Sequence, residues 1–140
     1  MAGRRRALTG GIVSLVVAAI TITVFGVLRD YGPESAIRKF HEAVAKHDPQ
    51  ELLRVSTQGL DSYAEQWLVG RVEDNLRRGA WYRVARMDRR PGLVVAEIDY
   101  VSPDGTEEQS VWTVVLVEKR WLVDAEQTGA FRRILRRRPF

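Results

Sequence analysis

Tyrosine hydroxyls and carboxylates are the side chains of this chain that could perform acid–base chemistry in a pocket. Four candidates come from the second half of the sequence: Tyr82, Asp99, Tyr100 and Asp124. Asp99 and Tyr100 are neighbours in a predicted strand, so their side chains point to opposite faces and do not serve one pocket. The pair Tyr82 and Tyr100 stays geometrically open, but no acid accompanies it. The same alternation also fits core tyrosines with hydrogen-bonded hydroxyls and solvated acids.

The other reactive residue types offer few further candidates. His41 adjoins a buried stripe and His47 lies near a helix end, and six residues apart they do not share a helical face as a metal pair would. The chain has no cysteine, which excludes disulfides, thiolate catalysis and cysteine-built metal sites. It also lacks a glycine-rich phosphate loop, a Gly-x-Ser-x-Gly elbow and a His-Glu-x-x-His motif. We therefore expect no metal, no cofactor and no catalytic residue.

Three helices are expected before the tyrosines. Pro33 begins the first, whose apolar positions recur at three and four residues: Ala36, Ile37, Phe40, Ala43 and Val44. Asp48 caps a short second helix, and Ser62 with Glu65 fits a capping box for a third helix that ends at Gly79.

From residue 80 the hydrophobic period changes to two, which predicts strands. The strands are expected over 81–87, 94–100, 111–117 and 121–126, with turns at 90–92, 102–105 and 119–120. Phe131, Ile134 and Leu135 then mark a short C-terminal helix.

The stretch Val111–Val117 is apolar on both faces. This pattern is typical of an interior strand whose second face meets a partner subunit or another element of the chain. We take Trp112, Val114 and Leu116 as the candidate interface, through which the protein would form a homodimer or bind a protein partner.

The N-terminal residues predict where the protein is located. The stretch Ala7–Leu28 holds no charged residue and would form a helix of roughly 33 Å at about 1.5 Å per residue, close to the ~30 Å core of a bilayer. Three arginines at positions 4–6 precede it, and basic residues are retained on the cytoplasmic side. We expect a cytoplasmic segment 1–6, a transmembrane helix 7–28 and an extracytoplasmic domain. A cleaved secretory signal is the competing interpretation, although no small-x-small site follows the apolar run.

Charge is divided unevenly along the chain. From Tyr31 to Phe131, 13 Lys and Arg stand against 17 Asp and Glu, so this body is mildly acidic. The C-terminal tail, 129–140, is basic through Arg132, Arg133, Arg136, Arg137 and Arg138. Clustered arginines bind anionic lipid head groups or nucleic acid, and a membrane tether favours the lipid. A solvated basic tail is the alternative, and we expect no nucleic-acid partner.

The order of three helices and an antiparallel meander resembles the nuclear transport factor 2-like superfamily, a cone-shaped group of cystatin-like α+β proteins. The resemblance rests on an amphipathic helix, an acidic turn and a leucine, and on a closing hairpin; these are Ala36, Phe40, Ala43, Asp48, Leu52, Trp112–Val115 and Trp121–Val123. It implies an α+β domain over 31–128, with three helices on a curved antiparallel sheet of about four strands.

The layout of one span and one small domain is similar to that of Mce-associated membrane proteins and of inner-membrane assembly factors of type IV secretion. It implies a non-enzymatic scaffold or accessory subunit of a bacterial envelope complex. Ketosteroid isomerase and the SnoaL-like cyclases, which share the fold, imply the alternative of a small-ligand binder or isomerase-like enzyme. In that case Tyr82 and Tyr100 would be the candidate pocket. A filled cone interior favours the scaffold, and an open polar cavity favours the ligand.

Overall fold

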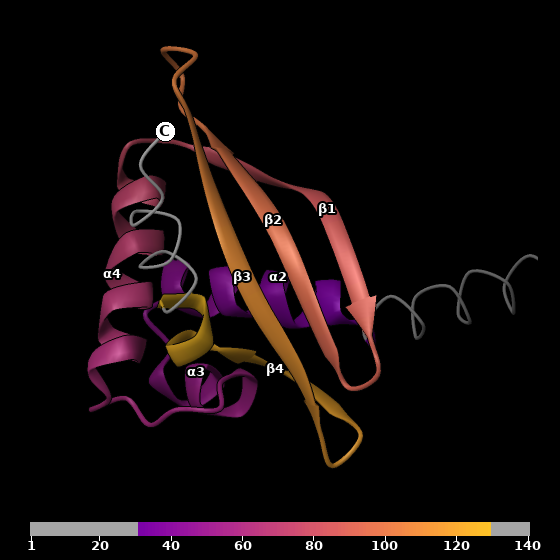
Figure 1. The fold of residues 1–140 in the computed structure, drawn as a ribbon. Helices are drawn as coiled ribbons and strands as arrows, with labels where there is room; N and C mark the ends of the chain where they lie inside the picture. The colour runs from indigo at the N-terminus through magenta and orange to yellow at the C-terminus, as the bar shows by residue number, and fades with distance from the viewer. Residues whose placement is uncertain (1–30, 130–140) are drawn as a thin grey trace, which may run out of the picture. The chain divides into compact units, whose positions relative to one another are not determined.

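A computed structural model of the protein describes residues 31–129 (Figure 1). Three helices come first and four strands follow: α2 (Pro33–Ala45), α3 (Pro49–Val55), α4 (Tyr63–Arg77), β1 (Trp81–Arg90), β2 (Leu93–Val101), β3 (Glu107–Val117) and β4 (Arg120–Asp124). The strands form one antiparallel sheet in the order β1-β2-β3-β4. The predicted α+β class, with three helices packed against a four-stranded antiparallel sheet, is confirmed.

The helix ends are set by local sequence signals. The Asp48 carboxylate accepts a hydrogen bond from the Glu51 amide at 3.1 Å and caps α3. The Ser62 hydroxyl accepts from the Glu65 amide at 3.5 Å and caps α4. The predicted capping box is only half formed, because the Glu65 carboxylate bonds to Ser56 instead. Gly79, with φ of +74°, provides the left-handed residue that leads from α4 to β1.

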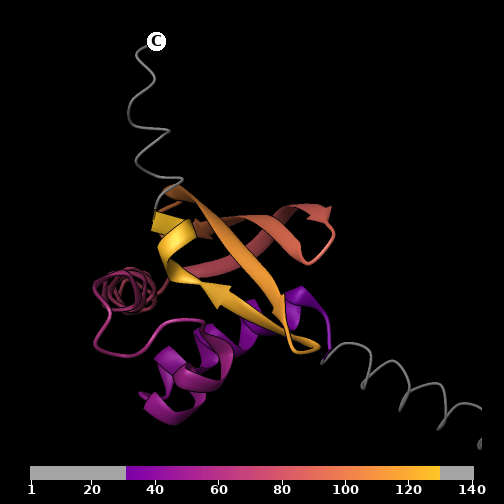
Figure 2. The same cartoon turned by 60° about the horizontal axis from the view of Figure 1, so that its bottom comes forward.

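The inner face of the sheet packs on the helices. On β2 every second side chain is buried, namely Val94, Ala96, Ile98 and Tyr100. Ala96 pairs with Trp112 on β3, and the Trp112 ring meets the Phe40 ring of α2 edge to face, with centroids 5.3 Å apart. Figures 1 and 2 show α2 crossing this face of the sheet. Burial of each large apolar side chain contributes about 1.5–3 kcal/mol, so this layer stabilises the domain.

A β-bulge in β1 changes which of its side chains face the helices. The register passes from Val84 opposite Ile98 to Arg86 opposite Glu97, so Ala85 is the extra residue. As a result Val84 and Met87, three positions apart, both pack against the core, and Arg86 is placed on the outer face. Strict alternation without the bulge would point Arg86 toward the helices.

The last strand ends earlier than the sequence pattern predicted. β4 stops at Asp124, and residues 125–129 are helical. The Asp124 carboxylate accepts a hydrogen bond from the Gln127 amide at 3.0 Å, as an N-cap does. Thr128 donates its hydroxyl to the Asp124 carbonyl at 2.7 Å and accepts from the Thr113 amide at 3.0 Å. The helical turn thus covers β3 beyond the end of β4. The prediction that β4 continues to residue 126 is wrong.

Several sequence predictions fall outside the described residues. These are the cytoplasmic segment 1–6, the transmembrane helix 7–28, the C-terminal helix and the arginines at 132, 133, 136, 137 and 138 of the basic tail. Within residues 31–129, no helix combines the length and the apolar character needed to cross a bilayer.

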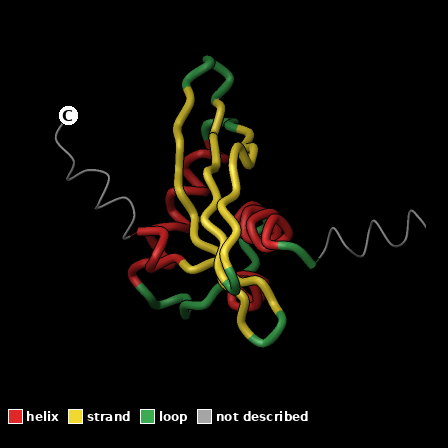
Figure 3. Tube along the Cα trace, turned by 45° about the vertical axis from the view of Figure 1, so that its right-hand side comes forward, coloured by secondary structure: helices red, strands yellow, loops and turns green. Residues whose placement is uncertain are grey.

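Figure 3 shows that the long β2–β3 hairpin extends past the helices.

Candidate functional site

The predicted pocket residues meet on the inner face of the sheet. Tyr82 of β1 lies directly opposite Tyr100 of β2, and their ring centroids are 6.3 Å apart. The sequence left this pairing open, and the register of β1 with β2 brings the two residues together. Tyr100 is buried, whereas Tyr82 is only partly buried.

A histidine that the sequence analysis set aside lies between these rings and Trp112. The His41 imidazole stacks on Tyr82 with centroids 3.8 Å apart and on Trp112 at 5.0 Å, nearly parallel to both. It projects from α2, next to Phe40, and is 3% exposed. The signal that could have found it is its position four residues after Ile37, on the edge of the apolar stripe. We call His41, Tyr82, Tyr100 and Trp112 the aromatic cluster.

Hydrogen bonds show which ring nitrogen of His41 carries a proton. Its Nδ1 lies 2.8 Å from the Ile37 carbonyl oxygen, which only accepts, so Nδ1 carries the proton. In the neutral ring, Nε2 then accepts a hydrogen bond from the Tyr100 hydroxyl at 2.7 Å. Both ring nitrogens are satisfied in the neutral imidazole, and protonation of Nε2 would remove the acceptor that Tyr100 uses.

Burial changes the acidity of these groups in the direction that keeps them neutral. Burial lowers the pKa of His41 to about 4, although the hydrogen bond to Ile37 opposes the change. Burial is also the main reason that the pKa of Tyr100 is raised, with Tyr82 adding to the effect. The pKa of Tyr82 is raised, first by burial and then by the charge of Glu42. The cluster is thus a neutral, hydrogen-bonded part of the core near pH 7.

The candidate acids do not join the tyrosines. Asp99 lies on the outer face, where its carboxylate binds Arg83 at 3.1 Å. Asp124 caps the helical turn that begins at residue 125. Among residues 31–129, no group of three histidine or carboxylate side chains is placed to hold a metal ion.

A second buried polar group lies near the start of α4. The Glu65 side chain is 1% exposed, and its Oε1 accepts a hydrogen bond from the Ser56 hydroxyl at 2.6 Å. Its Oε2 has no hydrogen-bond partner within the described part of the chain. Burial raises the pKa of Glu65 more than the Ser56 bond lowers it. A raised folded-state pKa means that Glu65 favours the folded state most at low pH, and that this contribution declines as pH rises.

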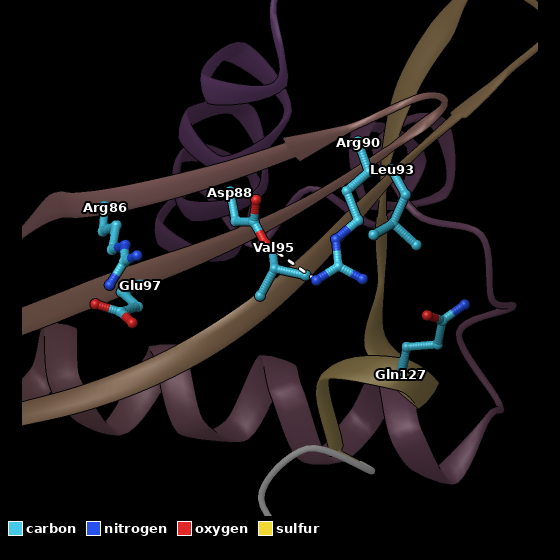
Figure 4. Close-up of a pocket in the computed structure, with 7 residues that line it drawn as sticks. All are labelled: Arg86, Asp88, Arg90, Leu93, Val95, Glu97 and Gln127. Carbon is cyan, nitrogen blue, oxygen red and sulfur yellow. Dashed lines mark hydrogen bonds and ion pairs between the residues drawn. The ribbon is translucent and has the colours of Figure 1, made fainter.

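An open groove occupies the outer face of the sheet beside β1 (Figure 4). Its volume is about 500 Å³, and it is lined by side chains of β1, β2 and the turn at 125–129: Arg86, Asp88, Arg90, Leu93, Val95, Glu97 and Gln127. Arg90 and Asp88 form an exposed ion pair at 3.1 Å. We call this the outer groove; it has apolar walls and charged rims of both signs.

A smaller hollow of about 330 Å³ is lined by α4, β3 and Thr128. At this hollow the Glu108 carboxylate forms ion pairs with Arg71 and, at 3.4 Å, with Arg78. One carboxylate is thus shared by two guanidinium groups, which leaves a net positive charge on these three side chains.

Two of the three predicted interface residues are buried and are not available for contact with a partner. Trp112 and Val114 are 0% exposed because their side chains face the helices and form part of the domain's own core. Leu116, near the end of β3, is 43% exposed and remains available. On the opposite face, Thr113 is covered through Thr128, so another element of the chain covers part of this second face. The sequence correctly showed two apolar faces on β3 but not which one faced the core.

Comparisons with known proteins give no assignment. No family model matches the chain, and no curated protein matches it. A solved structure from Campylobacter jejuni, of a protein provisionally named as an NTF2-like transpeptidase, is similar with 11% sequence identity and a TM-score of 0.48. The match covers 66% of this chain and 97% of that chain. At this level the likeness carries no information on activity, and the word transpeptidase applies to that protein.

Proposed function

We propose that this protein is a single-pass, membrane-anchored interaction domain that acts as a non-enzymatic scaffold or accessory subunit of an envelope complex. The observation that carries the proposal is the contrast between the aromatic cluster, whose His41 and Tyr100 are buried and bonded to each other, and the open outer groove. At the candidate pocket, the His41 imidazole and the Tyr100 hydroxyl bond to each other, so neither is free to bind a ligand. The alternative of a small-ligand binder or isomerase-like enzyme is therefore less well supported.

The proposed location rests on the sequence. The uncharged stretch Ala7–Leu28 follows three arginines at positions 4–6, which favours a cytoplasmic N-terminus and an extracytoplasmic domain. The five arginines between 132 and 138 would then lie near a bilayer and contact anionic head groups. The proposed layout is similar to that of Mce-associated membrane proteins. External protease added to spheroplasts should digest the domain, and a protected domain would contradict this orientation.

Interaction through the outer face is tested by crosslinking the full-length protein in membranes and purifying it. Val95 lines the outer groove and is partly buried, so Val95→Glu places a charge where a partner would pack. We expect this variant to lose its protein crosslinks while remaining in the membrane fraction. Leu53→Glu is the matched control, because Leu53 is 50% exposed on α3, away from the sheet face that bears the groove. Equal crosslinking by wild type and both variants, or recovery of lipid alone, would contradict the proposal.

A further inference from the structure

The two edge strands of the sheet differ in whether their outer backbone groups are paired. The β4 edge is covered, because Ser56 forms a parallel bridge to Val123 and the Thr57 amide donates to the Val123 carbonyl at 3.0 Å. β1 forms the other edge and pairs only with β2 within residues 31–129. A strand of ten residues therefore presents unpaired backbone groups along one side. Such an edge either is protected against pairing or is used for pairing with another chain.

The side chains of β1 decide what this edge accepts. Arg83, Arg86, Arg89 and Arg90 stand against Asp88, the one acid of the strand. Arg83 is paired with Asp99 and Arg90 with Asp88, so Arg86 and Arg89 are the arginines of β1 that form no ion pair within residues 31–129. A second copy of β1 at this edge would bring arginines against arginines, and like charges on neighbouring strands destabilise pairing. The same charges attract carboxylates. The edge is thus protected against a second copy and is complementary to an acidic segment.

The bulge at Ala85 restricts the regular part of this edge. After the bulge the ladder with β2 runs unbroken from Arg86 to Arg90, and three of the four arginines lie in this stretch. Arg86, Asp88 and Arg90 from the same stretch line the outer groove, as Figure 4 shows. The unpaired backbone and the groove therefore belong to one surface.

An extended segment added at Arg86–Arg90 would use both features. Neighbouring strands lie about 4.8 Å apart, and alternate side chains of an added strand point to the outer face beside Arg86 and Arg90. Val95, which also lines the groove, lies on β2 opposite Asp88. Main-chain hydrogen bonds would supply affinity, and the charged rim and the groove would supply specificity.

We propose that the open edge of β1, over Arg86–Arg90, binds an extended acidic segment of a partner protein by strand addition. The proposal rests on the interaction role given above and names the chemistry of the partner. It is independent of the membrane location and of which envelope complex is involved.

The experiment uses the full-length protein in detergent and a fluorescent eight-residue peptide that alternates glutamate and valine. We expect saturable binding, weakened by salt, that is at least tenfold tighter than binding of the same peptide with lysine in place of glutamate. Two further peptides carry backbone N-methyl groups at every second residue, one at the odd positions and one at the even positions. Each keeps the charge of the parent peptide but lacks the N–H donors along one edge of the extended chain. One of the two should bind at least tenfold more weakly.

Charge-reversed variants locate the site. Arg86→Glu with Arg89→Glu should lower peptide affinity at least tenfold while circular dichroism shows an unchanged fold. Arg54→Glu with Arg77→Glu makes the same charge change at two side chains of α3 and α4 that are each 70% exposed, and should leave affinity unchanged. Equal loss in both pairs, or full binding by both N-methylated peptides, would overturn strand addition at β1. Dimerisation of wild type that the Arg86–Arg89 change abolishes would instead identify a second copy as the occupant.

The crosslinking experiment and the peptide-binding experiment can fail independently of each other. If Val95→Glu abolishes crosslinks but the acidic peptide does not bind, the interaction role stands and strand addition is wrong. If the peptide binds at β1 but no crosslink depends on Val95, the edge binds acidic segments and the proposed scaffold role is wrong.

Discussion

The two faces of the sheet are formed by alternate residues of the same strands but differ in burial. Val94 is 1% exposed beneath the helices, while its neighbour Val95 is only partly buried at the outer groove. Trp112 is fully enclosed on the inner face, and Trp81, on the outer face of β1, is 55% exposed. Residue type is therefore a poor guide to role here, because the helices, not hydrophobicity, decide which face becomes core.

The sharpest test of this contrast compares the two tryptophans. Trp112→Ala leaves a cavity against Phe40 and should lower the free energy of unfolding by about 3–5 kcal/mol. Trp81→Ala removes a half-exposed ring and should cost less than about 1 kcal/mol. Denaturant unfolding of the two variants measures both values. Similar losses would show that the outer face contributes as much packing as the inner one.

The next effect concerns pH and the aromatic cluster. The pKa of His41 is about 4 in the folded protein against an ordinary 6.5, so the unfolded chain binds a proton that the folded one does not. Stability contributed by neutral His41 is therefore fully present above pH 6.5 and is lost as pH falls toward 4, by about 3 kcal/mol.

His41→Phe keeps a ring in the stack but does not titrate. Unfolding curves at pH 7.5 and pH 4 should differ less for this variant than for wild type, and the difference between the two proteins isolates His41. The variant also leaves the Tyr100 hydroxyl without its acceptor, which should cost about 1–3 kcal/mol at pH 7.5. An unchanged pH dependence would mean that His41 is accessible to protons in the folded state.

The same substitution on each face of the sheet compares how much the two faces contribute to stability. Val94→Ala on the inner face should cost about 2 kcal/mol, from lost burial and a residual cavity. Val95→Ala on the outer face should cost less than half of that, because Val95 is only partly buried. The free energies of unfolding of the two variants give the comparison, and a larger loss at Val95 would reverse our view of which face is core.

The smallest expected effect is at the turn that follows β4. Asp124→Ala removes the cap of the helical segment 125–129 and should lower the free energy of unfolding by about 1 kcal/mol. Amide hydrogen exchange at Thr113 should also speed up, since that amide is held by Thr128. Unchanged exchange would show that the turn stays in place without its cap.

Local signals predicted the elements of the fold well. Asp48 and Ser62 cap the helices that they were expected to cap, and Gly79 lies where α4 ends. Such signals act between residues a few positions apart, so a single sequence contains them. The fourth strand was predicted too long because Asp124, which continues an alternating pattern, caps a helix in the structure.

The candidate site was predicted only in part. The alternation left the pair Tyr82 and Tyr100 open, and the structure places them opposite each other. The alternation did not indicate that His41, on a helix and 41 residues before Tyr82 in the chain, joins them. The bulge at Ala85, which places Arg86 on the outer face, leaves no mark in the alternation of β1. Both features depend on contacts between elements that are distant in the sequence.

The sequence by itself determined the α+β order, the helix caps, the turns and the existence of two apolar faces on β3, because these follow from short-range backbone preferences and hydrophobic period. Only the tertiary structure decided that Trp112 lies in the core, that His41 is neutral and enclosed, and that the β1 edge is open while the β4 edge is bridged by Ser56. The physical reason is that burial depends on which element packs on which face, and that packing joins residues far apart in the chain.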